Sequence, residues 1–349
     1  MVDVVNVSHF DPGWNWLARN FSARPDLRWT HFSTQSTPVP AWLPRRQTWQ
    51  RIACAWAACG HLEASDAILV SHGPRMTMYA GLGCSARRQR VRHLAYSFNY
   101  TDLPSGLLRR VQARVFATVD RFVVFSTLER SLYAEYFGLD PDRIDVIPWA
   151  VEPPRVPSDA GPLVAGDYVC AVGSQARDYA VLLQAMKSLP AVRLVIVATP
   201  ESMAGLSVPP NVEVRTSIPY RDAINVIAHS RFMILPLRDS RVPCGHVTLV
   251  SAMHLCKAIV ATGSAGIADY VQDGVNARLV PPRDAAGLAA AIDELMQAPD
   301  TRERLAQSGH RFSMAHCTEA NVVAYFERLL QRWPTDRGEA SAAYRPRTL

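Results

Sequence analysis

The sequence lacks the features of a membrane-spanning, secreted or disulfide-stabilised protein. No apolar run reaches the roughly 18 residues that are needed to cross a bilayer. The first residues, Met1 to Val7, carry neither the basic segment nor the small-residue cleavage site of a signal peptide, and they favour a buried strand. The seven cysteines are odd in number and scattered and form no Cys-x-x-Cys pair, which argues against a disulfide framework and a zinc site. We therefore expect a cytoplasmic protein.

Lysine is almost absent, because only Lys187 and Lys257 contribute to the 37 basic residues. Nearly all positive charge is therefore guanidinium, which pairs with phosphate through two parallel hydrogen bonds. A general bias of codon composition explains the same pattern. The charge is uneven, since residues 1–114 hold 14 arginines and 6 acidic residues, whereas the whole chain of 349 residues carries +6. A basic surface is expected in the N-terminal third.

Short apolar runs alternate with longer segments of helical period, which predicts α/β architecture with parallel sheets and crossover helices. In the first half the expected strands are Val4–Ser8, Trp29–Ser33, Ala67–Ser71, Leu94–Phe98, Phe122–Phe125 and Ile144–Ile147, and the expected helices are Arg45–Ala58, Gly106–Ala117 and Leu128–Phe137. In the second half the expected strands are Tyr168–Val172, Leu194–Ala198, Val212–Val214, Phe232–Leu235, Ala258–Ala261 and Ala277–Val280, and the expected helices are Asp178–Lys187, Tyr220–His229, Val247–Leu255, Asp284–Met296 and Glu319–Arg332.

Residues 151–162 contain four prolines and no regular period, which is typical of a linker. The pattern therefore predicts two Rossmann-like domains over residues 1–152 and 166–318, joined by a linker over 153–165. Residues 319–349 follow as a C-terminal helix, which can cross back to the first domain, and a loose tail. Ligands of open α/β sheets bind outside the carboxyl ends of the strands, so the site is expected in a cleft between the two domains.

Two turns in the second domain suit a phosphate. Gly245 stands just before an expected helix, so that the backbone N–H groups of Gly245, His246 and Val247 can face an anion with the helix dipole behind them. The next expected strand ends in Gly263-Ser264-Ala265-Gly266, a second turn of this kind. Either turn alone is weak evidence, but both at neighbouring strand ends favour a nucleotide diphosphate.

The region around these turns resembles the donor-binding region of GT-B glycosyltransferases of family 4. The matching segments, in the family's order and spacing, are Pro236, Gly245, Ala252-Met253, Lys257 to Thr262, Gly266 to Val271, and Gly274 to Asp284. The likeness covers most of residues 166–333. It extends more loosely to Arg121-Phe122-Val123-Val124-Phe125-Ser126 and to the stretch from Arg143 to Pro153.

The resemblance implies the GT-B fold, in which two Rossmann-like domains face each other across a cleft. It also implies the transfer of a hexose from a nucleoside-diphosphate sugar, with retention of configuration. The acceptor would be a hydroxyl of a glycan or lipid-linked glycan, in polysaccharide or glycolipid synthesis. The domain over residues 1–152 would bind this acceptor, and the domain over residues 166–318 the donor.

No metal or other cofactor is expected. A metal-bound donor is usually accompanied by an Asp-x-Asp at the end of a strand. The chain does contain Asp140-Pro141-Asp142, but this segment lies between an expected helix and an expected strand, which indicates a turn.

Several residues of the second domain are candidates for holding the donor. The resemblance places the turn after the strand Tyr168–Val172 beside the donor phosphates, and Arg177 there can neutralise the charge that builds on the leaving diphosphate. Arg238 is a second candidate for this role. For either arginine, an exposed position in solvent is the alternative interpretation. The remaining candidate donor-binding residues are Gly173, Ser174, Gly245, His246, Val247, Thr248, Ser251, Ser264 and Gly266.

One departure from the family concerns two glutamates, which commonly contact the donor sugar with its phosphate and the ribose. Their positions hold Pro243 and Ser251 here. Ser251 can still hydrogen-bond a ribose hydroxyl, but a charged acceptor is missing. His246 either contacts the sugar or phosphate or is only a neighbour of the helix N-cap.

Two alternative functions stay open. A nucleotide-sugar epimerase can share this two-domain fold. A non-catalytic nucleotide-sugar-binding subunit would explain the loss of the glutamates.

Loops after the expected strands of the first domain should face the acceptor. Asp11, His72 and Asp102 are candidate bases for the acceptor hydroxyl, although capping or turn roles suit them equally well. Gly13 allows the backbone to approach a ligand closely.

The expected helix Arg45–Ala58 carries arginine and tryptophan at helical spacing. An Arg/Trp surface suits anionic lipid headgroups and predicts peripheral contact with the inner membrane face. Its expected members are Arg45, Arg46, Trp49, Arg87 and Arg88. The alternative is that the tryptophans pack in a core and the arginines are merely solvated. No nucleic-acid-binding motif accompanies the charge, so nucleic acid is not expected as a partner.

Overall fold

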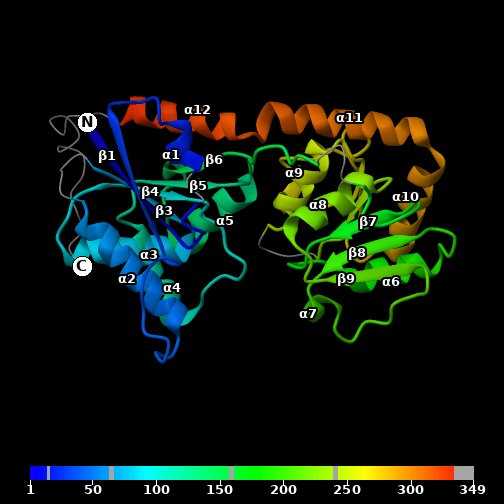
Figure 1. The fold of residues 1–349 in the computed structure, drawn as a ribbon, viewed down its shortest axis with the longest axis horizontal. Coiled ribbons are helices and arrows are strands. Elements are labelled where there is room, and N and C mark those ends of the chain that lie inside the picture. The colour runs from blue at the N-terminus through cyan, green and yellow to red at the C-terminus, as the bar shows by residue number, and fades with distance from the viewer. Residues whose placement is uncertain (14–15, 63–66, 157–160, 239–242, 334–349) are drawn as a thin grey trace. The chain divides into compact units, whose positions relative to one another are not determined.

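The computed structural model describes residues 1–13, 16–62, 67–156, 161–238 and 243–333. These residues form two compact units, each built around a six-stranded sheet (Figure 1). Unit 1 contains Met1–Phe125, Arg130–Ile147 and the chain from Val322 onward, and unit 2 contains Ser126–Glu129 and Pro148–Asn321. All pairs of neighbouring strands in both sheets are parallel, as the alternation of apolar runs and helical segments predicts.

The sheet of unit 1 has the strand order β2-β1-β3-β4-β5-β6. Its strands are β1 (Val2–Ser8), β2 (Leu27–Ser33), β3 (Ile68–His72), β4 (Arg92–Tyr96), β5 (Arg121–Val124) and β6 (Ile144–Val146). The helices up to β6 are α1 (Trp16–Asn20), α2 (Arg46–Gly60), α3 (Pro74–Ala86), α4 (Gly106–Phe116), α5 (Thr127–Phe137) and the short 3-10 helix η1 (Pro141–Arg143). The central strand β3 is buried throughout, as expected for an apolar run covered on both faces.

The sheet of unit 2 has the strand order β12-β11-β10-β7-β8-β9. Its strands are β7 (Val169–Val172), β8 (Leu194–Ala198), β9 (Val212–Thr216), β10 (Met233–Leu235), β11 (Ile259–Thr262) and β12 (Arg278–Val280). Its helices are α6 (Tyr179–Lys187), α7 (Pro200–Met203), α8 (Tyr220–His229), α9 (His246–His254), the 3-10 helix η2 (Ala265–Ile267), α10 (Ala285–Gln297) and α11 (Pro299–His316), and α12 (Glu319–Arg332) ends the described chain.

Helices cover both faces of the sheet in unit 2. Cys170 and Val172 of β7 belong to an apolar cluster with α8 and α9, whereas Val169 and Ala171 belong to a cluster with α6 and α10. Successive residues of the strand therefore point to opposite faces, and both faces are buried. The strand order reverses between β7 and β10, and such a reversal is where open α/β sheets bind ligands.

The expected strands and helices are confirmed, with bounds that differ by up to two residues. The turn expected at Asp140-Pro141-Asp142 is η1, in which the Asp140 carboxylate accepts a hydrogen bond from the Asp142 N–H at 2.9 Å. The long helices α3 and α11 were not expected. No helix in the described ranges is long and apolar enough to cross a membrane.

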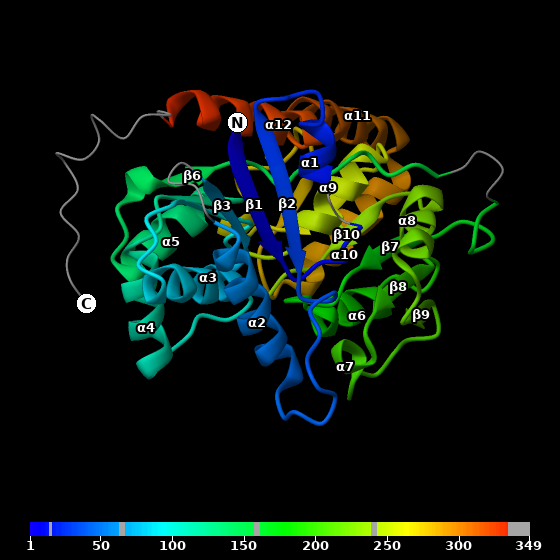
Figure 2. The same cartoon turned by 60° about the vertical axis from the view of Figure 1, so that its left-hand side comes forward.

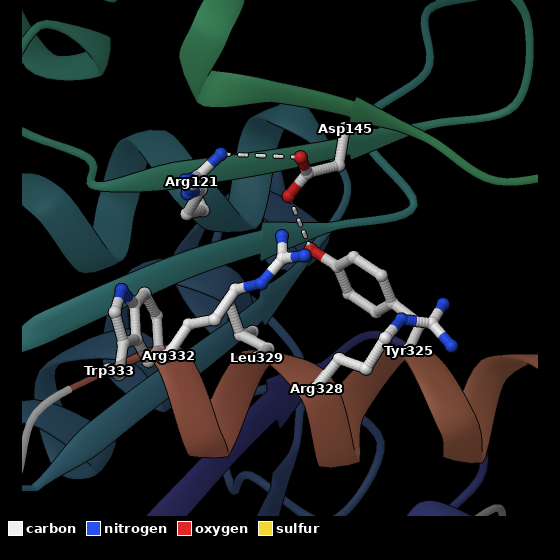
Figure 3. A pocket seen from close by; sticks show the side chains of 7 residues that line it. All are labelled: Arg121, Asp145, Tyr325, Arg328, Leu329, Arg332 and Trp333. Atoms are coloured by element: carbon white, nitrogen blue, oxygen red, sulfur yellow. Dashed lines mark hydrogen bonds and ion pairs between the residues drawn. The ribbon is translucent and has the colours of Figure 1, made fainter.

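Helix α12 packs on unit 1. The Tyr325 hydroxyl donates to Asp145 Oδ2 of β6 at 2.8 Å, and Arg121 Nη1 lies 3.3 Å from Asp145 Oδ1 (Figure 3). Phe326 lies 5.6 Å from Tyr96, measured between ring centroids. A cavity of about 90 Å³ remains beside these contacts, and its lining residues are Arg121, Asp145, Tyr325, Arg328, Leu329, Arg332 and Trp333.

Candidate functional site

The turn after β7 and the turn before α9 meet around the Arg177 side chain. Gly173 and Gly245 both have positive φ, +112° and +101°, where side chains are strongly disfavoured. A Cβ atom on Gly173 would lie 2.6 Å from Arg177 Nη2, and one on Gly245 would lie 3.5 Å from Arg177 Nη1. The guanidinium therefore lies between two glycine backbones at the ends of β7 and β10, next to the reversal of strand order.

The Arg177 guanidinium is buried and fully oriented by neutral acceptors. The residue is only 5% exposed. Nη2 donates to Thr248 Oγ1 at 2.6 Å and to the Val172 carbonyl at 3.3 Å. Nε donates to the same carbonyl at 3.4 Å, and Nη1 donates to the Gln175 carbonyl at 2.9 Å. These bonds occupy four of the five N–H donors, and the fifth is on Nη1, the nitrogen nearest Gly245.

In the described part of the chain, no carboxylate balances this charge. Among the residues that the structure describes, none forms an ion pair with Arg177. Burial lowers the pKa of Arg177, but a guanidinium stays protonated in proteins. A buried charge is stabilised by pairing, so the position favours an anionic ligand. The positive end of the α9 dipole, which begins at Gly245, acts in the same direction.

Backbone bonds hold the Arg177 turn against the segment after β10. The Asp178 N–H donates to the Pro236 carbonyl at 2.9 Å, and the Arg238 N–H donates to the Ala176 carbonyl at 2.9 Å. Asp178 caps α6 by accepting from the Val181 N–H at 3.2 Å. The alternative interpretation of Arg177 as exposed in solvent is therefore wrong.

The other candidate donor residues have varied surroundings. Ser174 Oγ accepts from the Thr199 N–H at 2.7 Å, which ties the turn to α7. Arg238 is exposed and Thr248 is half-buried. Ser264 caps η2 by accepting from the Gly266 N–H at 3.3 Å. Gly266 packs so closely on Pro243 that a Cβ there would lie 2.7 Å from the Pro243 Cα.

His246 begins α9, but its ring points into the unit. Nε2 donates to the Gly266 carbonyl at 2.8 Å, and the ring lies 4.8 Å from the Tyr270 ring. The residue is 7% exposed, and burial lowers its pKa, so the ring is neutral at pH 7. The structure therefore offers a ligand the backbone N–H of His246, with the ring engaged elsewhere.

Ser251 is also buried, at 1% exposure. Its Oγ donates to the Val247 carbonyl at 2.7 Å and lies 3.3 Å from the Tyr220 hydroxyl. Tyr220 is 58% exposed and Val247 is 45% exposed. Sequence reasoning missed Tyr220, although its place four residues after a strand of this sheet was a usable signal.

Asp269 and Tyr270, which belong to the quoted motif, hold other segments of unit 2. The Asp269 carboxylate accepts from the Thr127 N–H at 2.7 Å and from the Thr127 hydroxyl at 2.9 Å. The Tyr270 hydroxyl accepts from the Trp149 N–H at 2.7 Å. The sequence placed both residues in a motif without indicating these structural roles.

The candidate bases all lie in unit 1. His72 is 1% exposed, its Nε2 is 2.7 Å from Asn6 Oδ1, and burial lowers its pKa to about 3. Asp11 is exposed and accepts from the Gly13 N–H at 2.8 Å, which forms a turn at the exposed Gly13. Asp102 is exposed in the loop after β4. The role of each as a base stays a prediction.

The residues of the predicted Arg/Trp surface belong to α2, its N-terminal boundary and the end of α3, and Figure 2 shows these two helices. Trp49 and Trp56 are 47% and 49% exposed, so the alternative that they fill a core is wrong. Arg87 stacks its guanidinium 4.1 Å above the Trp56 ring. The other arginines predicted for this surface, Arg45, Arg46 and Arg88, are exposed.

No group of three or more His, Cys, Asp or Glu side chains in the described part of the chain is arranged to hold a metal ion.

Comparison with known families identifies the second unit. Residues 166–298, which include Arg177, Gly245 and α9, match the model of the family described as Glycosyl transferases group 1. The predicted resemblance to group 1 enzymes of the family 4 type is therefore confirmed for this region. A search of curated proteins found no match.

Solved structures similar to this chain have the GT-B fold. Anabaena HepE in complex with UDP has 15% sequence identity and a TM-score of 0.71 over 95% of this chain and 100% of that chain. Sucrose-phosphate synthase from Thermosynechococcus elongatus has 14% identity and a TM-score of 0.69 over 95% of this chain and 99% of the synthase chain. A UDP-forming trehalose-phosphate synthase from Burkholderia xenovorans has 12% identity and a TM-score of 0.65 over 95% of this chain and 98% of the synthase chain. The chain that carries the group 1 domain thus has the GT-B fold, as expected.

Proposed function

We propose that the protein is a glycosyltransferase that moves a hexose from a nucleoside-diphosphate sugar to a hydroxyl of a glycan or lipid-linked glycan, without a metal ion. The observation that carries this proposal is the buried Arg177 guanidinium, which lies between Gly173 and Gly245 and has no carboxylate partner among the described residues. The group 1 match supports it, as do solved structures of HepE with UDP and with UDP-glucose.

Arg177 acts on the charge that develops during transfer. The bond between the sugar C1 and the β-phosphate oxygen breaks, and negative charge builds on the departing diphosphate. Arg177 and the N–H groups at the start of α9 stabilise this charge, because they are fixed before the reaction begins. Thr248 keeps the guanidinium in place by accepting its hydrogen bond.

The acceptor oxygen forms the new bond to C1 and releases its proton to a base. Asp11 and Asp102 are the exposed candidates for that base, and the burial of His72 disfavours the third candidate. By the family resemblance, the configuration at C1 is retained.

The Arg/Trp surface supports a position of the enzyme at an anionic membrane. Exposed Trp49 and Trp56 suit the lipid interface, and Arg45, Arg46 and Arg87 suit its phosphate groups. A peripheral position on the inner membrane face would bring the protein to a lipid-linked acceptor, as in polysaccharide or glycolipid synthesis.

The test is a transfer assay with the purified protein, EDTA, UDP-glucose or GDP-mannose, and a lipid extract as the acceptor. Release of the nucleoside diphosphate should require the extract. Arg177→Ala should lower the rate about 100-fold or more, as for the loss of a fixed donor to a developing anion. Arg311→Ala, at an exposed position on α11, is the matched control.

Three results would contradict the proposal. Conversion of the donor to an isomer without acceptor would indicate an epimerase. Binding of donor without turnover on any acceptor would indicate a non-catalytic subunit. Equal rates for Arg177→Ala and the wild type would remove Arg177 from the site.

A further inference from the structure

Tyr220 is the first residue of α8, and its ring is largely exposed beside the group 1 site. At 58% exposure it leaves much of an apolar ring in solvent. It lies four residues after the end of β9 and so near the carboxyl edge of the sheet, where the Gly173 and Gly245 turns also lie.

A hydrogen bond fixes Tyr220 against α9. Ser251 Oγ uses its only proton to donate to the Val247 carbonyl, so it accepts from the Tyr220 hydroxyl, which lies 3.3 Å away. Because Ser251 is buried, the bond attaches the tip of an exposed ring to a rigid helix. The ring is therefore oriented in the absence of a ligand.

An exposed apolar side chain, Val247, precedes the residue that binds Arg177. Val247, the second residue of α9, is 45% exposed. Its carbonyl and the Tyr220 hydroxyl both form a hydrogen bond with the Ser251 hydroxyl. Thr248, which binds Arg177, is the next residue along the helix. The α9 residues that bind Arg177 and Tyr220, Thr248 and Ser251, are thus three positions apart, which places them on the same side of the helix. That combination matches a ligand with a diphosphate at one end and a flat aromatic group at the other.

We propose that Tyr220 is the platform on which the base of the nucleoside diphosphate stacks. This inference rests on the proposed function and assigns the residue that holds the base. A tyrosine ring stacks on the π-face of any base, so Tyr220 contributes affinity without selecting among uracil, guanine and adenine. The bond to Ser251 orients the ring, whereas the ring itself provides the contact.

The test compares ligands that do and do not carry a base. The full-length wild type, Tyr220→Ala and Tyr220→Phe are titrated calorimetrically with UDP, GDP and inorganic pyrophosphate. One of the two nucleotides should bind to the wild type. Tyr220→Ala should weaken the binding of that nucleotide by a factor of about ten or more, because base–aromatic stacking is lost. Its affinity for pyrophosphate should not change. Tyr220→Phe keeps the ring and should stay within about threefold of the wild type.

Met314→Ala, which shortens another exposed apolar side chain of unit 2, is the matched control and should bind like the wild type. Circular dichroism checks that each variant is folded.

The failure modes are distinct. If Tyr220→Ala binds the nucleotide as tightly as the wild type, the platform is wrong while the proposed donor site stands. If Tyr220→Ala weakens the binding of nucleotide and of pyrophosphate equally, Tyr220 acts on the anion site and not on a base. That result also overturns the inference. If the folded wild type binds neither UDP nor GDP, the proposed function fails and the platform fails with it.

Discussion

His72 and His93 are residues of unit 1 whose burial makes folding sensitive to pH. They are 1% and 3% exposed, and burial lowers the pKa of each to about 3. His93 Nε2 on β4 lies 2.7 Å from Ser71 Oγ on the neighbouring strand β3. In the unfolded protein each ring takes up a proton near pH 6.5. In the folded protein each ring stays neutral to a much lower pH.

We predict that the free energy of unfolding falls as the pH drops below about 6.5. The pKa of an unfolded histidine is about 6.5, so below that pH the unfolded state binds more protons than the folded state. Each histidine then lowers stability by about 1.4 kcal/mol per pH unit, or about 2 kcal/mol between pH 6.5 and 5. Urea unfolding at a series of pH values measures this effect.

His93→Gln should reduce the slope of the free energy of unfolding against pH by the contribution of about one proton. This holds whatever the stability of the variant at pH 7. His229→Gln, at an exposed residue of α8, should keep the wild-type slope. A His93→Gln slope equal to that of the wild type would refute the assignment of this proton uptake to His93.

Single residues also show how far the sequence predicts the site. The family resemblance, together with the position of Arg177 after a strand, made it a phosphate-binding candidate. Its contact with Thr248, 71 positions away, and its burial between two glycines depend on how β7 and β10 pair, which no local pattern specifies. For the same reason the sequence could not show that the His246 ring turns inward to Gly266.

At the scale of elements, apolar runs between turn residues predicted the strands well, whereas the short helices α1 and α7 and the two long helices α3 and α11 were missed. Helix α3 contains Gly81 and Gly83, which weaken a helical prediction. Its packing explains them, because a Cβ on Gly83 would lie 2.9 Å from Cys59 Sγ of α2, and α3 also contacts α4 (Figure 2). Helix α11 is mostly polar and buries only Leu305, Ala306, Gly309 and Ser313.

The packing of α12 on unit 1 gives a prediction about stability. Tyr325 is 8% exposed, and burial together with the neighbouring Asp145 carboxylate raises its pKa, so the hydroxyl stays protonated and donates to Asp145 (Figure 3). Tyr325→Phe should lower the free energy of unfolding by about 1–2 kcal/mol, as for the loss of a partly buried hydrogen bond to a charged group. Urea unfolding provides the measurement.

Tyr220→Phe is the control for the removal of a tyrosine hydroxyl, because its longer hydrogen bond and exposed ring predict little change in stability. If Tyr325→Phe is as stable as the wild type, this bond does not stabilise α12 on unit 1.

At the scale of the whole molecule, the sequence predicted two α/β halves but not the order of their strands. Strand order depends on pairings between distant segments, such as Met233 of β10 beside Cys170 of β7. This pairing joins the Gly173 and Gly245 turns into one site, which the sequence presented as two separate motifs.

The central claim is that these turns bind a nucleoside diphosphate through Arg177 without a metal ion. The most direct test is calorimetric titration of the wild type, Arg177→Ala and Thr248→Val with UDP and GDP in the presence of EDTA. The wild type should bind one of the two nucleotides. Arg177→Ala should weaken that binding about 100-fold, because a buried charged partner of the phosphate is lost. Thr248→Val should weaken it less, because the guanidinium remains but is no longer held by the threonine hydroxyl.

Binding by the wild type that depends on Arg177 would support a donor site that works without the family's two glutamates. Absence of binding to both nucleotides by the folded wild type, or equal binding by Arg177→Ala, would contradict the account.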